Sequence, residues 1–293
     1  MQRHGVGKSM EMEAASCPLC KEAGGVPLHR EDLFQMVKCP ACQFIYLNPR
    51  PTDRSLLDFY QGYLPEDGTS IESWKKMMGP IFRRSADLVK RHGERGKLLD
   101  VGTGFGFFLV EMKARGWEPE GVEISEKAIS YARNVLNVTV HSGPLEQAGL
   151  SKGRFDAVTA FYVIEHLPNP MAFLRECHRI LKPRGLLLLR YPHTTPIKNF
   201  LQALGVKNRL YDLPAHLSDF SPGTIQKCLE EVGFTGCRHS LGGYTIPKGV
   251  RKRLATSLFG NLAEGLFCLS RGTILLPGVS KTAIAFKKAT DIT

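Results

Sequence analysis

Four cysteines near the N-terminus are spaced as metal ligands usually are. Cys17 and Cys20 form one CxxC pair, and Cys39 and Cys42 form a second pair after eighteen intervening residues. Each pair can turn back on itself and present both thiolates to one tetrahedral ion, so the spacing predicts a zinc site. A redox CxxC is the alternative, but both pairs precede any βαβ unit. Because four thiolates leave no position open for water, the predicted zinc is structural.

A glycine-rich loop is the second group of residues with chemical meaning. The segment LLDVGTGFGFFL places an apolar run and Asp100 ahead of Gly102, Gly104 and Gly106. Glycines in such a loop let a ligand approach the backbone at the carboxyl edge of an α/β sheet. Glu123 ends the next apolar run, where a dinucleotide site also has an acid. The GxGxG spacing, however, departs from the GxGxxG of dinucleotide sites, and the GK[ST] of a phosphate-binding P-loop does not follow. The loop therefore favours a cofactor with one nucleoside and no pyrophosphate.

These residues need a scaffold that brings them to one edge of a sheet. From Lys97 onward the predicted strands are KLLDV, EGVEI, NVTVH, FDAVTAF and LLLLRY, and the predicted helical connections are 105–115, 125–135, 146–150 and 170–181. Repeated strand–helix–strand units imply right-handed crossovers and a parallel sheet covered on both faces. Further along, 222–233 indicates a last covering helix. The fold class is α/β, with a small zinc ribbon in front of the sheet.

Taken in order, LLDVGTGFG with VEIS, FDAVTAFYVIEHLPNP and RILKPRGLLLL resemble the class I S-adenosylmethionine-dependent methyltransferases over about residues 96–245. The resemblance implies a Rossmann-like sheet that holds S-adenosylmethionine, and it makes TAIAFKKA a reversed final strand. The positions that match the family's cofactor site are Asp100, Gly102, Gly104, Gly106, Glu123, Ile124, Gly143, Leu145 and Phe161. By position, the loop glycines would make room for the methionyl part and Glu123 would accept the ribose hydroxyls. Gly143 and Leu145 would line the adenine, with Phe161 below the sulfonium.

The N-terminal part carries a second resemblance. MVKCPACQFIYLNPRPT followed by LLDFYQGYL is similar to zinc-ribbon methyltransferases of bacterial sugar, surface-polysaccharide and secondary-metabolite pathways. The resemblance implies that the ribbon and the helices after it cover the substrate mouth, with Tyr60 and Tyr63 closing over the cofactor; simple packing is the alternative for both tyrosines. Residues 71–92, interrupted by Gly79-Pro80, predict two linked helices.

Three histidines are candidates for a general base. Methyl transfer from a sulfonium is an in-line displacement, and a hydroxyl acceptor must also lose its proton, which neutral histidine can accept near neutral pH. His166 follows FDAVTAF, His193 lies in YPHTTP and His216 in PAHLSDFSP. A structural role is the alternative for each, and most of all for His166 in the EHL element. Glu165 is expected to organise this loop or the amine of the cofactor.

Composition limits the partners. The chain of 293 residues has a formal net charge of +11, with 39 basic and 28 acidic residues interspersed, which permits an anionic partner without naming one. RNA methylation is therefore an alternative, although the sequence has no aromatic-basic stripe or base-flipping signature. The first residues lack the apolar core of a secretory signal, and no run approaches the roughly 20 apolar residues of a membrane span. A cytoplasmic location is the expectation.

The segment 247–280 is a predicted amphipathic insertion. Apolar residues recur there at every fourth position: Val250, Leu254, Leu258, Leu262 and Leu266. Basic residues precede or begin this helix: Lys248, Arg251, Lys252 and Arg253. Such a helix over 248–269 would suit an anionic membrane surface, and packing on its own domain or in a dimer is the alternative.

The sequence thus predicts four parts: a flexible N-terminus (1–16), a zinc ribbon (17–50), a helical linker that covers the substrate (51–95) and a methyltransferase domain (96–293) with a substrate-side insertion at 192–222. The predicted function is methyl transfer from S-adenosylmethionine to a small molecule or sugar, with oxygen favoured as acceptor. RNA methylation and a non-catalytic adaptor are the alternatives. The sequence leaves the oligomeric state open.

Overall fold

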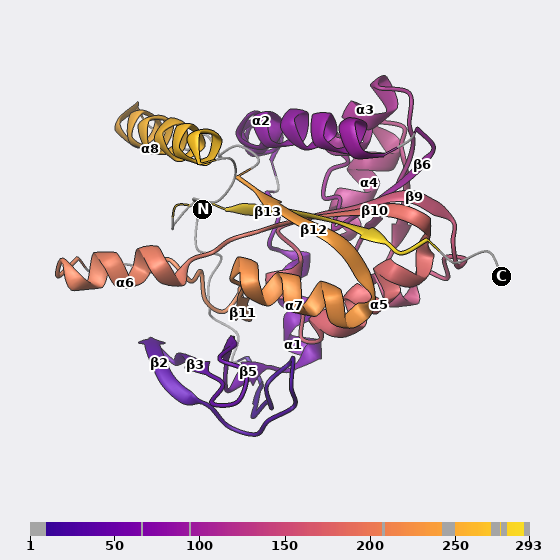
Figure 1. The fold of residues 1–293 in the computed structure, drawn as a ribbon. Coiled ribbons are helices and arrows are strands. Elements are labelled where there is room, and N and C mark those ends of the chain that lie inside the picture. The colour runs from indigo at the N-terminus through magenta and orange to yellow at the C-terminus, as the bar shows by residue number, and fades with distance from the viewer. Residues whose placement is uncertain are drawn as a thin grey trace.

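A seven-stranded sheet forms the centre of the computed structural model, which describes residues 10–65, 67–93, 95–206, 209–241, 250–270, 276 and 280–289 (Figure 1). The strands are β6 (Lys97–Val101), β7 (Glu118–Glu123), β8 (Thr139–Ser142), β9 (Phe155–Phe161), β10 (Leu181–Tyr191), β12 (Phe234–Ser240) and β13 (Lys281–Lys287). Their order is β12-β13-β10-β9-β6-β7-β8. The five strands β10, β9, β6, β7 and β8 are parallel to one another, and β13 is antiparallel to both β10 and β12. The predicted α/β fold and the reversed last strand are confirmed; β12 was not predicted.

Helices cover both faces of this sheet (Figure 1). One face carries α2 (Gly68–His92), α3 (Phe107–Ala114) and α4 (Glu126–Asn134), and the other carries α5 (Pro170–Ile180) and α7 (Pro222–Val232). The central strands supply apolar side chains to both layers: Leu98 and Leu188 pack toward α2 and α3, whereas Leu99 and Leu189 pack toward α5 and α7. This double burial explains why the strands read as continuous apolar runs in the sequence.

The prediction of two helices separated at Gly79-Pro80 is wrong, because α2 runs without a break from Gly68 to His92 with Pro80 inside it. A proline inside a helix costs about 3 kcal/mol. Buried apolar residues on both sides of it outweigh that cost, since each buried side chain contributes about 1.5–3 kcal/mol. The buried residues of α2 include Ile71, Met78, Ile81, Phe82 and Val89.

The ribbon forms a second sheet that takes one strand from far along the chain. Its order is β11-β4-β3-β2, built from β2 (Val26–Glu31), β3 (Phe34–Lys38), β4 (Ile45–Leu47) and β11 (Ser218–Asp219). In the antiparallel pair of β11 with β4, Ser218 lies opposite Tyr46. The insertion predicted at 192–222 is therefore hydrogen-bonded to the ribbon. Phe44 and Phe220 pack at this junction, with ring centroids 4.8 Å apart. A two-stranded pair, β1 (Met12–Glu13) with β5 (Arg50–Pro51), precedes α1 (Asp53–Gln61).

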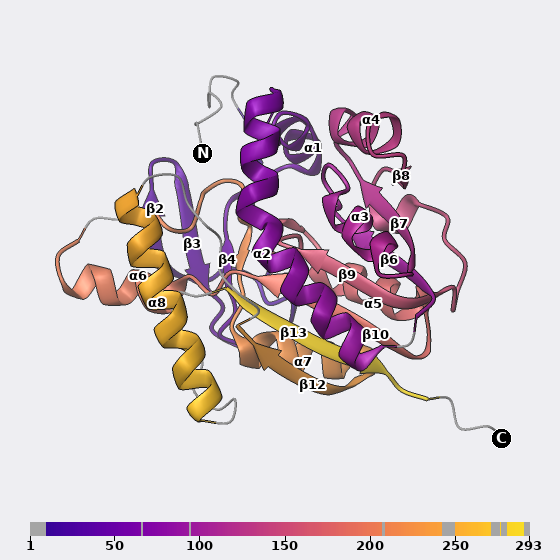
Figure 2. The ribbon, with the colours of Figure 1, turned by 90° about the horizontal axis from the view of Figure 1, so that it is seen from above.

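Two further helices lie at the side of the molecule where β13 begins (Figures 1 and 2). They are α6 (Thr195–Ala203), within the insertion, and α8 (Val250–Leu269). An ion pair between Arg84 and Glu264 ties α8 to α2. The exposed large apolar residues of α8 are Leu254, Leu258, Phe259, Leu262 and Leu269. The predicted helix thus exists with an uncovered apolar row.

The membrane contact predicted for 248–269 stays a prediction. Lys248 lies outside the described residues, and of the side chains of Arg251, Lys252 and Arg253 nothing is described. Among the helices of the described residues, none is long and apolar enough to cross a membrane.

Candidate active site

The four cysteines predicted as zinc ligands converge in the ribbon. Their sulfurs lie within 4.8 Å of one another, and the Sγ atoms of Cys17 and Cys42 are 3.5 Å apart, as are those of Cys20 and Cys39. Both CxxC segments form the same turn. In each, the residue after the second cysteine donates its N–H to the carbonyl of the first, and it has positive φ: Lys21 at 65° and Gln43 at 63°. Two matched turns around four thiolates fit a structural zinc.

The glycine loop follows β6 and holds a left-handed backbone. The φ angles of Gly102, Gly104 and Gly106 are 66°, 55° and 81°. At Gly102 a Cβ atom would lie 2.5 Å from Cγ2 of Val163, in the segment that follows β9. Only glycine allows this conformation and this approach together. The loop is therefore held directly against the segment that carries Glu165 and one of the candidate bases, His166.

Glu123, at the end of β7, joins the loop to the next turn. Its carboxylate accepts hydrogen bonds from the backbone N–H groups of Gly104 (2.8 Å), Ile124 (2.8 Å) and Ser125 (2.9 Å). The side chain is 7% exposed, and burial raises the pKa of its carboxyl while the three N–H groups oppose that rise. The predicted ribose acceptor thus sits at the mouth of the glycine loop.

The remaining cofactor residues predicted from the sequence take different positions around this loop. Asp100 is 2% exposed and accepts a 2.6 Å hydrogen bond from the Thr159 hydroxyl; burial raises the pKa of Asp100 to about 7. Nothing lies within 4 Å of the Cβ position of Gly143, so the turn after β8 is open there. The side chains of Leu145 and Phe161 pack in the core, against the α5 side and against Phe82 and Phe108 respectively.

The helix after the ribbon, α1, lies over the glycine loop. The sequence resemblance implies such a cover without naming these contacts. At the end of α1, the Gln61 side chain donates a 2.9 Å hydrogen bond to the carbonyl of Ile124. A Cβ atom at Gly104 would lie 3.5 Å from the Trp74 ring and 4.0 Å from Leu64. Gln61, Leu64 and Trp74 were not predicted as site residues, because in the sequence they are ordinary members of helical patterns.

His166 and His216, which are fifty residues apart in the chain, come together. Their ring centroids are 4.9 Å apart. Nδ1 of His166 lies 2.8 Å from the carbonyl oxygen of Ala215, and the N–H of Leu217 donates to the carbonyl of Glu165. The segment before β11 is thus fastened to the turn after β9. Burial lowers the pKa of both histidines, that of His216 well below its usual value, so both rings are neutral at neutral pH.

Two tyrosines and a glutamate complete this cluster. The rings of Tyr60 and Tyr63 pack edge-on to His166, with centroids 5.4 and 5.6 Å from it. The carboxyl of Glu165 is fully buried, neither of its oxygens has a hydrogen-bond partner, and burial raises its pKa to about 8. Glu165, His166 and His216 each place a potential ligand atom within 4.8 Å of the others.

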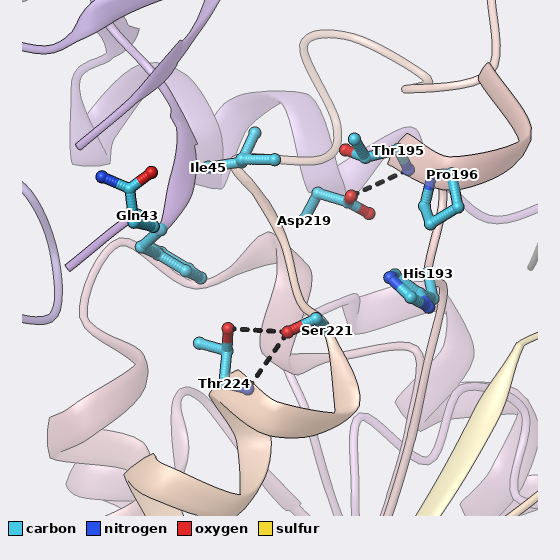
Figure 3. Close-up of a pocket in the computed structure, with 9 residues that line it drawn as sticks. Gln43, Ile45, His193, Thr195, Pro196, Asp219, Ser221 and Thr224 are labelled. Carbon is cyan, nitrogen blue, oxygen red and sulfur yellow. Dashed lines mark hydrogen bonds between the residues drawn. The ribbon is translucent and has the colours of Figure 1, made fainter. Parts of the chain in front are cut away.

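His193 is not part of this cluster. It lines a separate cavity of about 200 Å³ between the ribbon and the start of α7, together with Gln43, Asp219 and Ser221 (Figure 3). The Asp219 carboxylate there accepts the backbone N–H groups of Thr194 and Thr195, which fixes the start of α6. The structure thus brings two of the three predicted base candidates together and leaves His193 in a different place.

The arrangement can align two molecules. An acid and a glycine loop at the carboxyl ends of β6 and β7 suit a nucleoside that carries an amino-acid part, and neutral histidines beyond β9 suit proton removal from a second molecule. Both groups of residues follow the carboxyl ends of the parallel strands, where ligands of open α/β sheets bind.

Known proteins give the same picture. A family model described as "Methyltransferase domain" matches residues 73–239. Ubiquinone biosynthesis O-methyltransferase of Pseudomonas paraeruginosa is 33% identical over 138 residues, covering 45% of this chain and 60% of that protein. The protein of the same name from Dechloromonas aromatica is 30% identical over 131 residues, covering 43% and 56%. The matched part thus spans about 60% of the length of these curated relatives or less.

Two solved structures are similar in fold. A SAM-dependent methyltransferase from Archaeoglobus fulgidus has a TM-score of 0.52 and 20% identity, covering 75% of this chain and 100% of that one. Phosphoethanolamine N-methyltransferase 2 of Haemonchus contortus, solved in complex with S-adenosyl-L-methionine, has a TM-score of 0.53 and 17% identity, covering 83% and 63%. At these identities the likeness concerns the fold alone.

Proposed function

The chain belongs to the family that carries this methyltransferase domain, and from that premise we propose that it transfers a methyl group from S-adenosylmethionine to an oxygen of a small molecule or sugar. The observation that carries the proposal is the position of Glu123 at the mouth of the glycine loop, which packs on the segment of Val163 and His166. The His166 ring in turn packs on His216. The relatives named as O-methyltransferases support oxygen as the acceptor atom.

The cofactor residues in this proposal are the ones that the sequence resemblance implies. Glu123 would accept the ribose hydroxyls, and the carbonyl and N–H groups of the loop would meet the methionyl part. Because a Cβ atom at Gly143 would meet nothing within 4 Å, the turn after β8 has room for a planar adenine. Asp100 would act through the loop, since its carboxylate is already bonded to Thr159.

Most of the rate enhancement would come from alignment. Holding the acceptor in line with the sulfonium methyl can supply about 7–11 kcal/mol, and a positioned base adds about 10²–10⁴-fold. In the step itself the acceptor O–H bond breaks, the oxygen forms a bond to the methyl carbon, and the electron pair of the C–S bond returns to sulfur. His166 and His216 are the base candidates that this geometry supports, because they are neutral and lie next to the loop.

The side chains around the histidines favour a small acceptor. Tyr60, Tyr63 and the two imidazole rings give the cluster aromatic walls, and α1 covers it from the ribbon side. The RNA alternative rests on the basic net charge and on the presence of the ribbon. The four-cysteine cluster is assigned a structural zinc, which holds the ribbon against the insertion.

The test is direct binding followed by turnover. Calorimetry with the zinc-loaded full chain should give one site for S-adenosylmethionine, and a panel of phenols, catechols and sugar derivatives should include a substrate that releases S-adenosylhomocysteine. Absence of cofactor binding by the folded protein would reject the enzyme and leave the adaptor alternative. Salt-dependent retention of RNA, with a slope that requires several phosphate contacts, would replace the small molecule by RNA.

A further inference from the structure

We propose that Glu165, His166 and His216 together bind one divalent transition-metal ion at the acceptor site, separate from the four cysteines of the ribbon. This inference rests on the proposed function, because it assigns the chemistry of the acceptor side of that same site. It changes the part played by the histidines: they become ligands of an ion that activates the acceptor oxygen.

The first argument comes from Glu165. Its side chain is 0% exposed, and neither carboxylate oxygen has a hydrogen-bond partner. Buried polar groups are nearly always hydrogen-bonded, and a carboxyl group buried without partners carries an uncompensated desolvation cost even when it is protonated. Two other buried carboxylates, Glu123 at the end of β7 and Asp219 in β11, are satisfied by backbone N–H groups. A cation between Glu165 and its neighbours would supply the missing partner.

The second argument comes from the orientation of the His166 imidazole. Nδ1 of His166 lies 2.8 Å from the carbonyl oxygen of Ala215. A carbonyl oxygen accepts only, so Nδ1 of His166 carries the proton and Nε2 carries the lone pair. Metal-binding histidines are usually fixed in the same way, with one N–H held by a carbonyl and the other nitrogen on the ion.

The third argument is the ligand set and its geometry. The three potential donor atoms lie within 4.8 Å of one another, and bonds of about 2.0–2.2 Å to a shared ion would bring them to ~3–4 Å. Two imidazoles and one carboxylate suit zinc, iron, manganese or cobalt, whereas magnesium and calcium prefer oxygen ligands alone. Three protein ligands also leave coordination positions open, as catalytic rather than structural sites do.

An open position next to the cofactor loop has a chemical use. The turn that carries Glu165 and His166 packs against the glycine loop through Val163 and Gly102, so the proposed ligands lie beside the loop. A bound divalent ion lowers the pKa of a water on it, to about 7 at catalytic zinc sites, and it lowers that of a bound hydroxyl in the same sense. The acceptor proton then leaves to solvent, the oxygen forms its bond to the methyl carbon, and sulfur keeps the electron pair of the broken C–S bond.

The experiment measures metal binding directly, with cobalt(II) as the probe. The full chain, loaded with zinc at the cysteines, is titrated with Co²⁺ and followed by visible absorption and by metal analysis after desalting. We expect one further equivalent of metal per chain, with ligand-field bands but without the thiolate-to-cobalt charge transfer that cysteine ligands give. Glu165→Gln and His216→Gln should each weaken Co²⁺ binding at least tenfold.

Matched variants separate ligand loss from general damage. His193→Gln changes a histidine in the other cavity, and it should leave the second equivalent unchanged. S-adenosylmethionine binding and the melting temperature, measured on each variant, report whether the domain is intact. If Glu165→Gln does not fold, His216→Gln and His166→Asn carry the test.

The outcomes distinguish this inference from the proposed function. If the wild type binds S-adenosylmethionine but takes up no second metal, or if Co²⁺ binds equally well to Glu165→Gln and His216→Gln, the metal site is wrong and the histidines revert to base candidates. If Co²⁺ binds as expected but S-adenosylmethionine does not bind, the metal site stands and the proposed cofactor falls.

Discussion

The hydroxyl of Tyr60 donates a 2.7 Å hydrogen bond to the backbone carbonyl oxygen of Ala215. The same carbonyl oxygen lies 2.8 Å from Nδ1 of His166. Three segments meet at this one oxygen: the helix after the ribbon, the insertion after β10 and the turn after β9. Burial raises the pKa of Tyr60 well above its usual value, so the hydroxyl keeps its proton and acts as a donor. The orientation of His166 therefore depends on a residue outside the central sheet.

Tyr60→Phe should lower kcat for methyl transfer by about tenfold, while the affinity for S-adenosylmethionine changes little. The reason is that the loss of the hydroxyl loosens Ala215 and with it the His166 ring, whereas Glu123 and the glycine loop make no hydrogen bond to Tyr60. The measurement is steady-state kinetics with the acceptor found by screening, together with calorimetry for the cofactor. Tyr63→Phe is the matched control, since its hydroxyl makes only a 3.4 Å contact with Asp212. Equal effects of the two variants would contradict a positioning role for Tyr60.

Glu123→Gln should weaken S-adenosylmethionine binding by more than about tenfold, because a carboxylate accepts charge-assisted hydrogen bonds that an amide cannot match. The glutamine side chain would also place its NH₂ group, a donor, against the N–H of Gly104 or of Ser125, and that N–H would lose its acceptor. Calorimetry measures the change. Glu118→Gln, an exposed residue at the other end of β7, should bind the cofactor as the wild type does. Unchanged affinity in Glu123→Gln would remove this residue from the proposed cofactor site.

Removal of the zinc should affect the acceptor side more than the cofactor side. The ribbon strand β4 pairs with β11, and the residues before β11 carry Ala215 and His216. Chelation, or Cys39→Ser, should therefore reduce turnover by more than about tenfold and leave cofactor affinity within about threefold, because small zinc modules unfold without their metal. Zinc release assayed alongside activity checks this. Cys268→Ser, at an exposed cysteine of α8, is the control. Full turnover by metal-free protein would show that the ribbon does not hold the insertion.

Much of the fold followed from patterns of short range. The β9 prediction, FDAVTAF, matches Phe155–Phe161 residue for residue, because most of the run is buried on both faces and it begins just after the turn at 152–153. The helix α2 was misjudged at Pro80, where the local rule was correct and packing on the sheet outweighed it. Local rules fail in that way when a long apolar stripe continues past the break.

The cluster around Glu165 could not be assembled from the sequence alone. His216 is one of three histidines that the sequence offers as base candidates. Nothing in PAHLSDFSP indicates that β11 pairs with the ribbon and brings this residue to His166. A two-residue strand has no periodicity to detect. Glu165 was expected to organise its loop or the cofactor amine, and its unpartnered carboxylate becomes visible only when every surrounding hydrogen bond is known.

Lys281 gives a prediction about stability rather than catalysis. It is 0% exposed at the start of β13, its Nζ donates a 2.7 Å hydrogen bond to the carbonyl of Leu276, and it faces Arg190, His193 and His239. Burial first, and the charge of Arg190 second, lower the pKa of Lys281 from 10.5 to about 8. The folded protein therefore releases this proton at lower pH than the unfolded chain does.

Between pH of about 8 and 10.5 the unfolded chain binds more protons at Lys281 than the folded protein, so this residue makes the free energy of unfolding rise with pH, by at most about 1.4 kcal/mol per pH unit. Below that window both states are protonated and the contribution no longer changes. Urea unfolding at several pH values gives the free energy of unfolding of wild type and Lys281→Met. The value for the wild type minus that for the variant should rise steadily across the window, because tyrosines and cysteines titrate alike in both proteins. Lys288→Met, an exposed neighbour, should behave as the wild type does. Parallel pH profiles for wild type and Lys281→Met would mean that Lys281 holds its proton in the folded state as firmly as in water.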